Sequence, residues 1–195
     1  VAKTTFAADW PIWGGNGSRN MVSFEKGINL DFDPGRMDED EVVDMKTTKN
    51  IKWIAKLGSQ AYGNVTVADG RVYAGTNNES PRDPTKKGDR GIVMCFDEKT
   101  GKLNWQLVIP KLGAGKVSDW EYIGICSSPA IEGNRAYIVT NKCEVVCVDV
   151  EGLKNGNEGP FKSEAKYVNP KGQSAPLQEN LDADLIWKYD MRDEL

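Results

Sequence analysis

The stretch YGNVTVADGRVYAGTN at residues 62–77 can be laid over a second stretch of this chain, CSSPAIEGNRAYIVTN at residues 126–141. Both stretches end in the pattern Tyr-x-x-Thr-Asn, which begins at Tyr73 in the first copy and at Tyr137 in the second. A pattern that recurs in this way indicates an internal repeat. Each copy of the repeat is therefore expected to be part of one structural unit of the fold.

A second pair of matching elements follows the two copies. They are IVMCFD at residues 92–97 and EVVCVD at residues 144–149, and each precedes a tryptophan that has apolar neighbours, Trp105 or Trp187. Each unit thus contains a strand, a turn, a strand, a turn, a third strand and then a strand with the tryptophan. A four-stranded unit of this kind that occurs twice is typical of the blades of a β-propeller.

The residue types inside the units also favour strands. β-Branched and aromatic residues fill short runs on either side of the turn signals Asp69-Gly70 and Gly133-Asn134, as buried strands joined by tight turns require. No window sustains an apolar period of 3.6 residues, so we expect an all-β protein, a β-propeller of four-stranded antiparallel blades. The expected strands are residues 51–57, 62–67, 71–76, 92–97, 103–109, 126–131, 135–140, 144–150 and 185–191.

The segment CFDEKTGKLNW at residues 95–105 carries a family resemblance. It resembles the Ala-x-Asp-x-x-Thr-Gly-x-x-x-Trp docking motif of quinoprotein alcohol dehydrogenase-like propellers, the PQQ-binding-like repeat family, with Cys95 at the usual alanine. The resemblance implies that Trp105 caps the sheet of the neighbouring blade. It also implies that Thr100 and Gly101 make the turn between the third and fourth strands.

The same docking role falls to two other tryptophans under this resemblance. Trp53 lies in an apolar run that resembles the outer strand of a preceding blade. In the second copy only Cys147, Asp149 and Trp187 match the motif, because a polar insert at residues 152–184 separates them.

The amino-terminal part of the chain extends the resemblance. The runs WPIWGGNGSRNMVS at residues 10–23 and NIKWIAKLGSQAYGN at residues 50–64 resemble the start of exported bacterial members of the family. The first residues, VAKTTFAADWP, also resemble the junction that follows a removed export signal. We therefore expect a periplasmic or otherwise exported protein.

The repeat divides the chain into three parts. These are an amino-terminal extension with an acidic loop (1–49), a strand of a closing blade plus the first full blade (50–109), and a second blade with the long polar insert (110–195). Two blades and one strand cannot close a ring, so we expect the amino-terminal portion of a larger propeller of about eight blades. The remaining blades would come from the same precursor or from another chain.

Composition excludes several classes of partner and chemistry. With 25 basic and 29 acidic residues the chain has no basic stripe, which argues against a nucleic-acid partner. No apolar run approaches the length of about 20 residues that a membrane-spanning helix needs. The chain has no histidine, and its four cysteines lack the Cys-x-x-Cys spacing of zinc and haem sites. We therefore expect no catalytic residue and no metal ligand in this portion.

The innermost strand of a propeller blade lines the central channel. Polar residues on the expected innermost strands are therefore candidates to face that channel. The channel-facing candidates are Gln60, Tyr62, Asn64, Glu121, Ser127 and Ser128. They would either solvate a water-filled channel or contribute to a cofactor site. The resemblance offers PQQ with calcium as the alternative cofactors, but the adjacent cysteine pair that stacks on the quinone in such dehydrogenases is missing here. No cofactor is expected in this chain.

Three functions remain open at this point. The preferred one is a non-catalytic binding or scaffold module that binds a protein or carbohydrate partner through the loops at residues 79–90 and 152–184. The alternatives are a segment of a PQQ- and calcium-dependent dehydrogenase that oxidises alcohols or sugars, and a subunit of a larger redox or envelope assembly. In the first of these loops we expect Glu79 and Asp83 to contribute less than about 0.5 kcal/mol to stability, as surface residues do.

Overall fold

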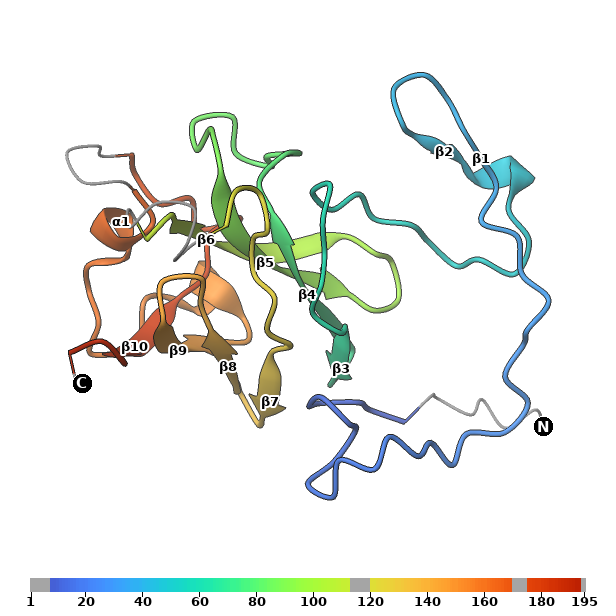
Figure 1. The fold of residues 1–195 in the computed structure, drawn as a ribbon, viewed down its shortest axis with the longest axis horizontal. Coiled ribbons are helices and arrows are strands. Elements are labelled where there is room, and N and C mark those ends of the chain that lie inside the picture. Colours follow the sequence, from blue (N-terminus) through green and yellow to red (C-terminus); the bar gives the residue numbers. More distant parts are fainter. Residues whose placement is uncertain (1–7, 113–119, 170–174, 194–195) are drawn as a thin grey trace.

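The computed structural model describes residues 8–112, 120–169 and 175–193, and in them it contains three antiparallel sheets (Figure 1). The first four-stranded sheet has the order β3-β4-β5-β6. Its strands are β3 (Thr66–Ala68), β4 (Arg71–Asn77), β5 (Arg90–Asp97) and β6 (Leu103–Pro110). Since each strand pairs with the next one along the chain, the sheet is a simple meander.

The second four-stranded sheet has the same topology, in the order β7-β8-β9-β10. Its strands are β7 (Ala130–Glu132), β8 (Arg135–Val139), β9 (Glu144–Asp149) and β10 (Leu185–Asp190). The all-β class is therefore confirmed, and the described residues form no closed barrel. The two copies of the sequence repeat each form the first two strands of one sheet.

Turn chemistry explains why the first hairpin forms where the sequence places it. The two central residues of the β3–β4 turn, Asp69 and Gly70, have φ angles of 48° and 73°. Positive φ at both positions is the requirement of a type I′ turn, whose twist matches that of the flanking strands. Thr66 accordingly lies opposite Tyr73, and Ala68 opposite Arg71.

Short elements occupy the remaining parts of the chain. In the extension, β1 (Arg36–Met37) pairs with β2 (Val43–Asp44), and a 3₁₀ turn, η1 (Met45–Thr47), follows. This hairpin lies to one side of the two large sheets (Figure 1). The insert forms a second 3₁₀ turn, η2 (Gly152–Asn155), and one helical turn, α1 (Glu164–Tyr167). No helix in these described ranges is long and apolar enough to cross a membrane.

The strand expected at residues 51–57 is wrong. These residues pair with no strand among those described, although their burial alternates as a strand's would. Trp53, Ala55 and Leu57 pack against the core from the alternate positions. The segment thus has the side-chain pattern of an outer strand. Among the described residues, however, no strand lies beside it to form the backbone hydrogen bonds of a ladder.

The first strand of each large sheet is shorter than expected. β7 begins at Ala130 rather than at Cys126, and the residue before it is Pro129, which has no N–H to donate to a ladder. β3 begins at Thr66, and Val67 exchanges two backbone hydrogen bonds with Trp10 of the extension. The extension also accepts a bond from Ile131 at Pro11, so residues 10 and 11 contact the first strand of both sheets.

One tryptophan joins the two sheets. Trp105 on β6 is 1% exposed, and its indole Nε1 donates to the carbonyl oxygen of Val150 at 2.8 Å. Gly152 lies beneath the ring with φ +67°, and a Cβ built there would be 2.8 Å from the indole. The site thus provides the apolar burial and the hydrogen-bond partner that a buried indole needs.

We expect Trp105→Ala to lower the free energy of unfolding by about 3–5 kcal/mol, because it removes a buried aromatic ring and leaves a cavity between the sheets. The exposed Trp120 is the matched control, and Trp120→Ala should cost less than about 0.5 kcal/mol. Urea unfolding followed by circular dichroism measures both values. Equal costs for the two variants would contradict this role of Trp105.

Candidate functional site

The channel-facing candidates of the two units lie partly side by side. Gly63 is in close contact with the second unit, since a Cβ built there would be 2.8 Å from the carbonyl oxygen of Ser127. The exposed Tyr62 donates its hydroxyl to Gln60 Oε1 at 3.0 Å, and Ser127 Oγ donates to the carbonyl of Val139 at 2.7 Å. The close approach thus places Gly63, the neighbour of Tyr62 in the chain, against the Ser127 backbone.

The other candidates are surface residues. Asn64 and Glu121 are exposed, and Ser128 is half-buried. Calcium prefers six to eight oxygen ligands, but no group of three or more His, Cys, Asp or Glu side chains among the described residues is placed to hold a metal ion. No calcium or quinone chemistry is assigned to these residues.

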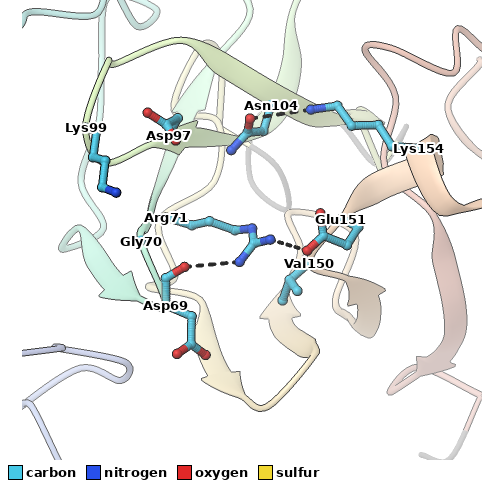
Figure 2. A pocket seen from close by; sticks show the side chains of 9 residues that line it. All are labelled: Asp69, Gly70, Arg71, Asp97, Lys99, Asn104, Val150, Glu151 and Lys154. Carbon is cyan, nitrogen blue, oxygen red and sulfur yellow. Dashed lines mark hydrogen bonds and ion pairs between the residues drawn. The ribbon is translucent and has the colours of Figure 1, made fainter.

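A cleft of about 310 Å³ opens between the two sheets on the side of the β3–β4 turn (Figure 2). One wall comes from that turn and from the β5–β6 connection of the first sheet, and the other from the end of β9 and η2. The lining residues are Asp69, Gly70, Arg71, Asp97, Lys99, Asn104, Val150, Glu151 and Lys154. Sequence reasoning did not place these residues together, because they come from turns in both units.

The charges of the cleft are balanced internally. Arg71 forms an ion pair with Glu151 across the opening and donates to the carbonyl oxygen of Asp69 at 3.1 Å (Figure 2). Lys154 reaches Asn104 Oδ1 at 3.4 Å. Hydrogen bonds from the Thr100 hydroxyl and N–H lower the pKa of the Asp97 carboxyl. Acidic and basic groups thus compensate one another, which favours a polar contact surface over a site for a single ion.

The buried thiol beside the cleft is not an active nucleophile. Cys95 is fully buried, with Asn104 Nδ2 4.0 Å from its sulfur. Burial raises the pKa of the thiol to about 12, so Cys95 is protonated near neutral pH. Since the thiolate is the reactive form of cysteine, Cys95 serves as a small apolar residue of the core.

A second constellation joins the β4–β5 loop to the long insert through one lysine. Lys86 is 1% exposed, and its ammonium lies 3.0 Å from Asp83 Oδ2 and 2.8 Å from Asp182 Oδ1. Gln178 completes the cluster by donating from its side chain to Asp83 and from its backbone to Asp182, at 2.9 Å each. We call Asp83, Lys86, Gln178 and Asp182 the loop junction.

The expectation that Asp83 is a surface residue is wrong. Its side chain is 1% exposed and accepts hydrogen bonds from the Thr85 N–H and hydroxyl, at 2.9 and 2.6 Å, besides its ion pair with Lys86. Desolvation alone would raise the pKa of this carboxyl. The bonds from Thr85 and the charge of Lys86 outweigh it and lower the pKa of Asp83 to about 2.

Further contacts hold the insert to the two sheets. Arg90 Nη1 at the start of β5 donates to the carbonyl of Val168 at 3.0 Å. The buried Glu144 of β9 accepts from the hydroxyl of Tyr167 at 2.7 Å and from Lys188 of β10 at 3.1 Å. These contacts fix the described parts of the insert to β5, β9 and β10 through buried charges with defined partners.

Sequence reasoning missed Lys86, Asp182 and Glu144 for a common reason. Charged residues in polar segments are usually solvated, and nothing in the local sequence identifies a partner far along the chain. The only signal was the length of the polar insert, which is uncommon for a connection between paired strands.

The chain matches no protein-family model, and no curated protein is significantly similar to it. The geometry of the cleft and of the loop junction is therefore the basis for the function.

We expect Lys86→Met to destabilise the protein by about 3–5 kcal/mol, because it leaves the buried carboxylates of Asp83 and Asp182 without their counter-charge. The neighbouring Lys87 is exposed, so Lys87→Met should change stability by less than about 0.5 kcal/mol. Chemical denaturation of the two variants tests the difference. A Lys86 variant as stable as the Lys87 variant would contradict the importance of the loop junction.

Acid should weaken the same junction. The folded pKa of Asp83 is about 2, below its ordinary value of 3.8, so the unfolded chain binds the proton more readily and the contribution of Asp83 is lost as the pH falls from about 4 to 2. The stability difference between the wild type and Asp83→Asn should therefore shrink over this range. Urea midpoints measured between pH 6 and pH 2 test this, with Glu79→Gln as the exposed control. A difference that does not change with pH would rule out the ion pair as its source.

Proposed function

We propose that this chain is a non-catalytic binding or scaffold module made of propeller-type blades. It binds a protein or carbohydrate partner through the β4–β5 loop and the insert between β9 and β10. The observation that supports this most directly is the loop junction, in which buried Lys86 fixes the loop to the insert through Asp83 and Asp182.

Fixed loops suit binding for a thermodynamic reason. A loop that is already ordered loses little conformational entropy when a partner binds, so more of the contact energy appears as affinity. The same loop carries exposed polar residues, such as Glu79, Arg82 and Lys87, beside the buried Asp83 and Lys86 in the sequence. Loops held by a rigid β scaffold are a common location for binding residues.

Further blades and an exported location belong to the same proposal. The two meanders packed through Trp105 support a stacked, propeller-type arrangement. Completion of a ring would require blades from the same precursor or from another chain, since closure removes exposed sheet edges.

A binding screen tests the proposal. The immobilised chain is exposed to a panel of soluble polysaccharides and exported proteins, and saturable binding is measured by interferometry. We expect the double variant Glu79→Ala/Lys87→Ala to lose binding while its unfolding midpoint is unchanged. The control Glu39→Ala/Asp40→Ala, in the β1–β2 hairpin, should bind as the wild type does.

Two outcomes would overturn the proposal. One is that no member of the panel binds saturably, or that the loop variant binds as well as the control. The other is dye reduction with an alcohol, PQQ and Ca²⁺ that disappears in Glu121→Gln, which would favour the dehydrogenase segment. The assay uses the protein in its longest natural form.

A further inference from the structure

The cleft between the two large sheets contains hydrogen-bond donors that the protein itself uses little. The exposed Lys99 donates its ammonium to no other described residue. Lys154 donates to Asn104 Oδ1 at the long distance of 3.4 Å, and the partner of Asn104 Nδ2 is the sulfur of Cys95 at 4.0 Å. Sulfur is a weak acceptor. Figure 2 shows Lys99 and Lys154 on opposite sides of the cleft, so donors on both sides can serve a ligand.

Acceptors line the same space. Glu151 uses its Oε1 for the ion pair with Arg71, and its Oε2 accepts from no described residue. The half-buried Asp97 accepts from the N–H and the hydroxyl of Thr100 at 2.7 and 2.6 Å, both at Oδ1. The lining of the cleft therefore offers acceptors as well as donors.

The second sheet shows how the charge of Asp97 differs from that of its counterpart. Strand register places Arg71 opposite Asp97 in the first sheet. In the second sheet it places Arg135 opposite Asp149, and these two residues form an ion pair. Arg71 instead forms its ion pair with Glu151 of the other wall. The carboxylate of Asp97 thus has no arginine partner among the described residues and keeps its charge within the cleft.

Both walls of the cleft are held by hydrogen bonds within the protein. In the first wall the Glu98 N–H donates to the carbonyl oxygen of Gly70 at 2.9 Å, which joins the two turns. In the second wall the fully buried Asp149 accepts from the Glu151 N–H at 2.7 Å. The ion pair between Arg71 and Glu151 then connects the walls. A site with fixed walls loses little conformational entropy when a ligand binds.

The charges and the size of the cleft define the class of ligand. Its lining contains equal numbers of basic and acidic side chains, so it favours neither a cation nor an anion. They are Arg71, Lys99 and Lys154, and Asp69, Asp97 and Glu151. A hydroxyl both donates and accepts, so a neutral ligand with several hydroxyls matches this lining. The volume of about 310 Å³ lies at the small end of the range of about 300–1,000 Å³ for ligand pockets, which suits one or two sugar rings.

We infer that this cleft binds a neutral mono- or disaccharide. Lys99, Lys154 and the side-chain amide of Asn104 donate hydrogen bonds to oxygens of the sugar. The carboxylates of Asp97 and Glu151 accept hydrogen bonds from its hydroxyls. The cleft contains no residue of the β4–β5 loop, so this site goes beyond the surface proposed above and can be tested separately from it.

Calorimetric titration of the protein in its longest natural form tests this site with glucose, galactose, mannose, maltose and cellobiose. We expect saturable binding of at least one of them, with a Kd on the order of 1 mM because so small a ligand makes few contacts. Lys99→Ala/Lys154→Ala should weaken binding by about tenfold, since hydrogen bonds from two charged donors are lost. The control Lys102→Ala/Lys166→Ala removes the same charge from exposed lysines outside the cleft and should bind as the wild type does.

Several outcomes of the titration would overturn the inference. They are that none of these sugars binds, that the two lysine variants bind equally well, or that the corresponding uronates or amino sugars bind more tightly than the neutral sugars. Weaker binding in Glu79→Ala/Lys87→Ala, with the cleft variant unchanged, would place the sugar on the loop. That result would support the proposed function and contradict the site in the cleft.

Nuclear magnetic resonance locates the sugar within the protein. With asparagine labelled selectively, the side-chain amide signal of Asn104 is identified by its loss in Asn104→Asp. We expect the sugar to shift this signal along the same saturation curve as the titration. The buried amide of Asn77, which donates to Ser59 Oγ at 2.9 Å and to the carbonyl oxygen of Tyr122 at 2.7 Å, should not shift. An Asn104 signal that is unchanged at saturation would rule out the cleft as the site.

Discussion

The docking of the Trp105 indole against the second sheet is the interaction on which the rest of the structure depends. Without it, two small meanders would each expose to water the apolar face that they now bury against each other. The dock works because three requirements coincide. The ring is buried, its N–H reaches the carbonyl of Val150, and Gly152 leaves the space that a side chain would fill. The half-buried Trp53 makes the equivalent hydrogen bond to Glu98 and lies against Gly101, so the dock occurs twice among the described residues.

Buried ion pairs and hydrogen bonds hold the segments that strand pairing does not hold. Lys86 lies between carboxylates from two segments that are distant in sequence, and Glu144 joins β9 to Tyr167 of the insert and to Lys188 of β10. Replacing all members of such a cluster together with apolar residues of similar volume often leaves stability unchanged, whereas removing one member leaves a buried charge unpaired, so buried ion pairs are weak evidence of stability for its own sake. Their effect here is to select one arrangement of loop and insert. A surface with one arrangement is what a binding module needs.

The two proposals concern different parts of the molecule and support each other. The loop junction orders the surface that we propose for partner binding. The mixed charges of the cleft fit the same description, since Arg71 and Glu151 connect the two sheets across it. The fully buried Cys95, with its raised pKa, is held as a core residue.

The sequence by itself determined the features that depend on neighbouring residues. Positive-φ turn residues at Asp69 and Gly70, β-branched runs and the internal repeat were enough to predict eight strands of the two meanders, with errors confined to their ends. Tertiary structure decided the features that depend on distant partners. Residues 51–57 have a strand's alternation but pair with no strand in the described part of the chain, and Asp83 is buried because Lys86 meets Asp182, 96 residues further along the chain. Local sequence encodes backbone preference and burial period, whereas a charge becomes buried only where the fold supplies its counter-charge.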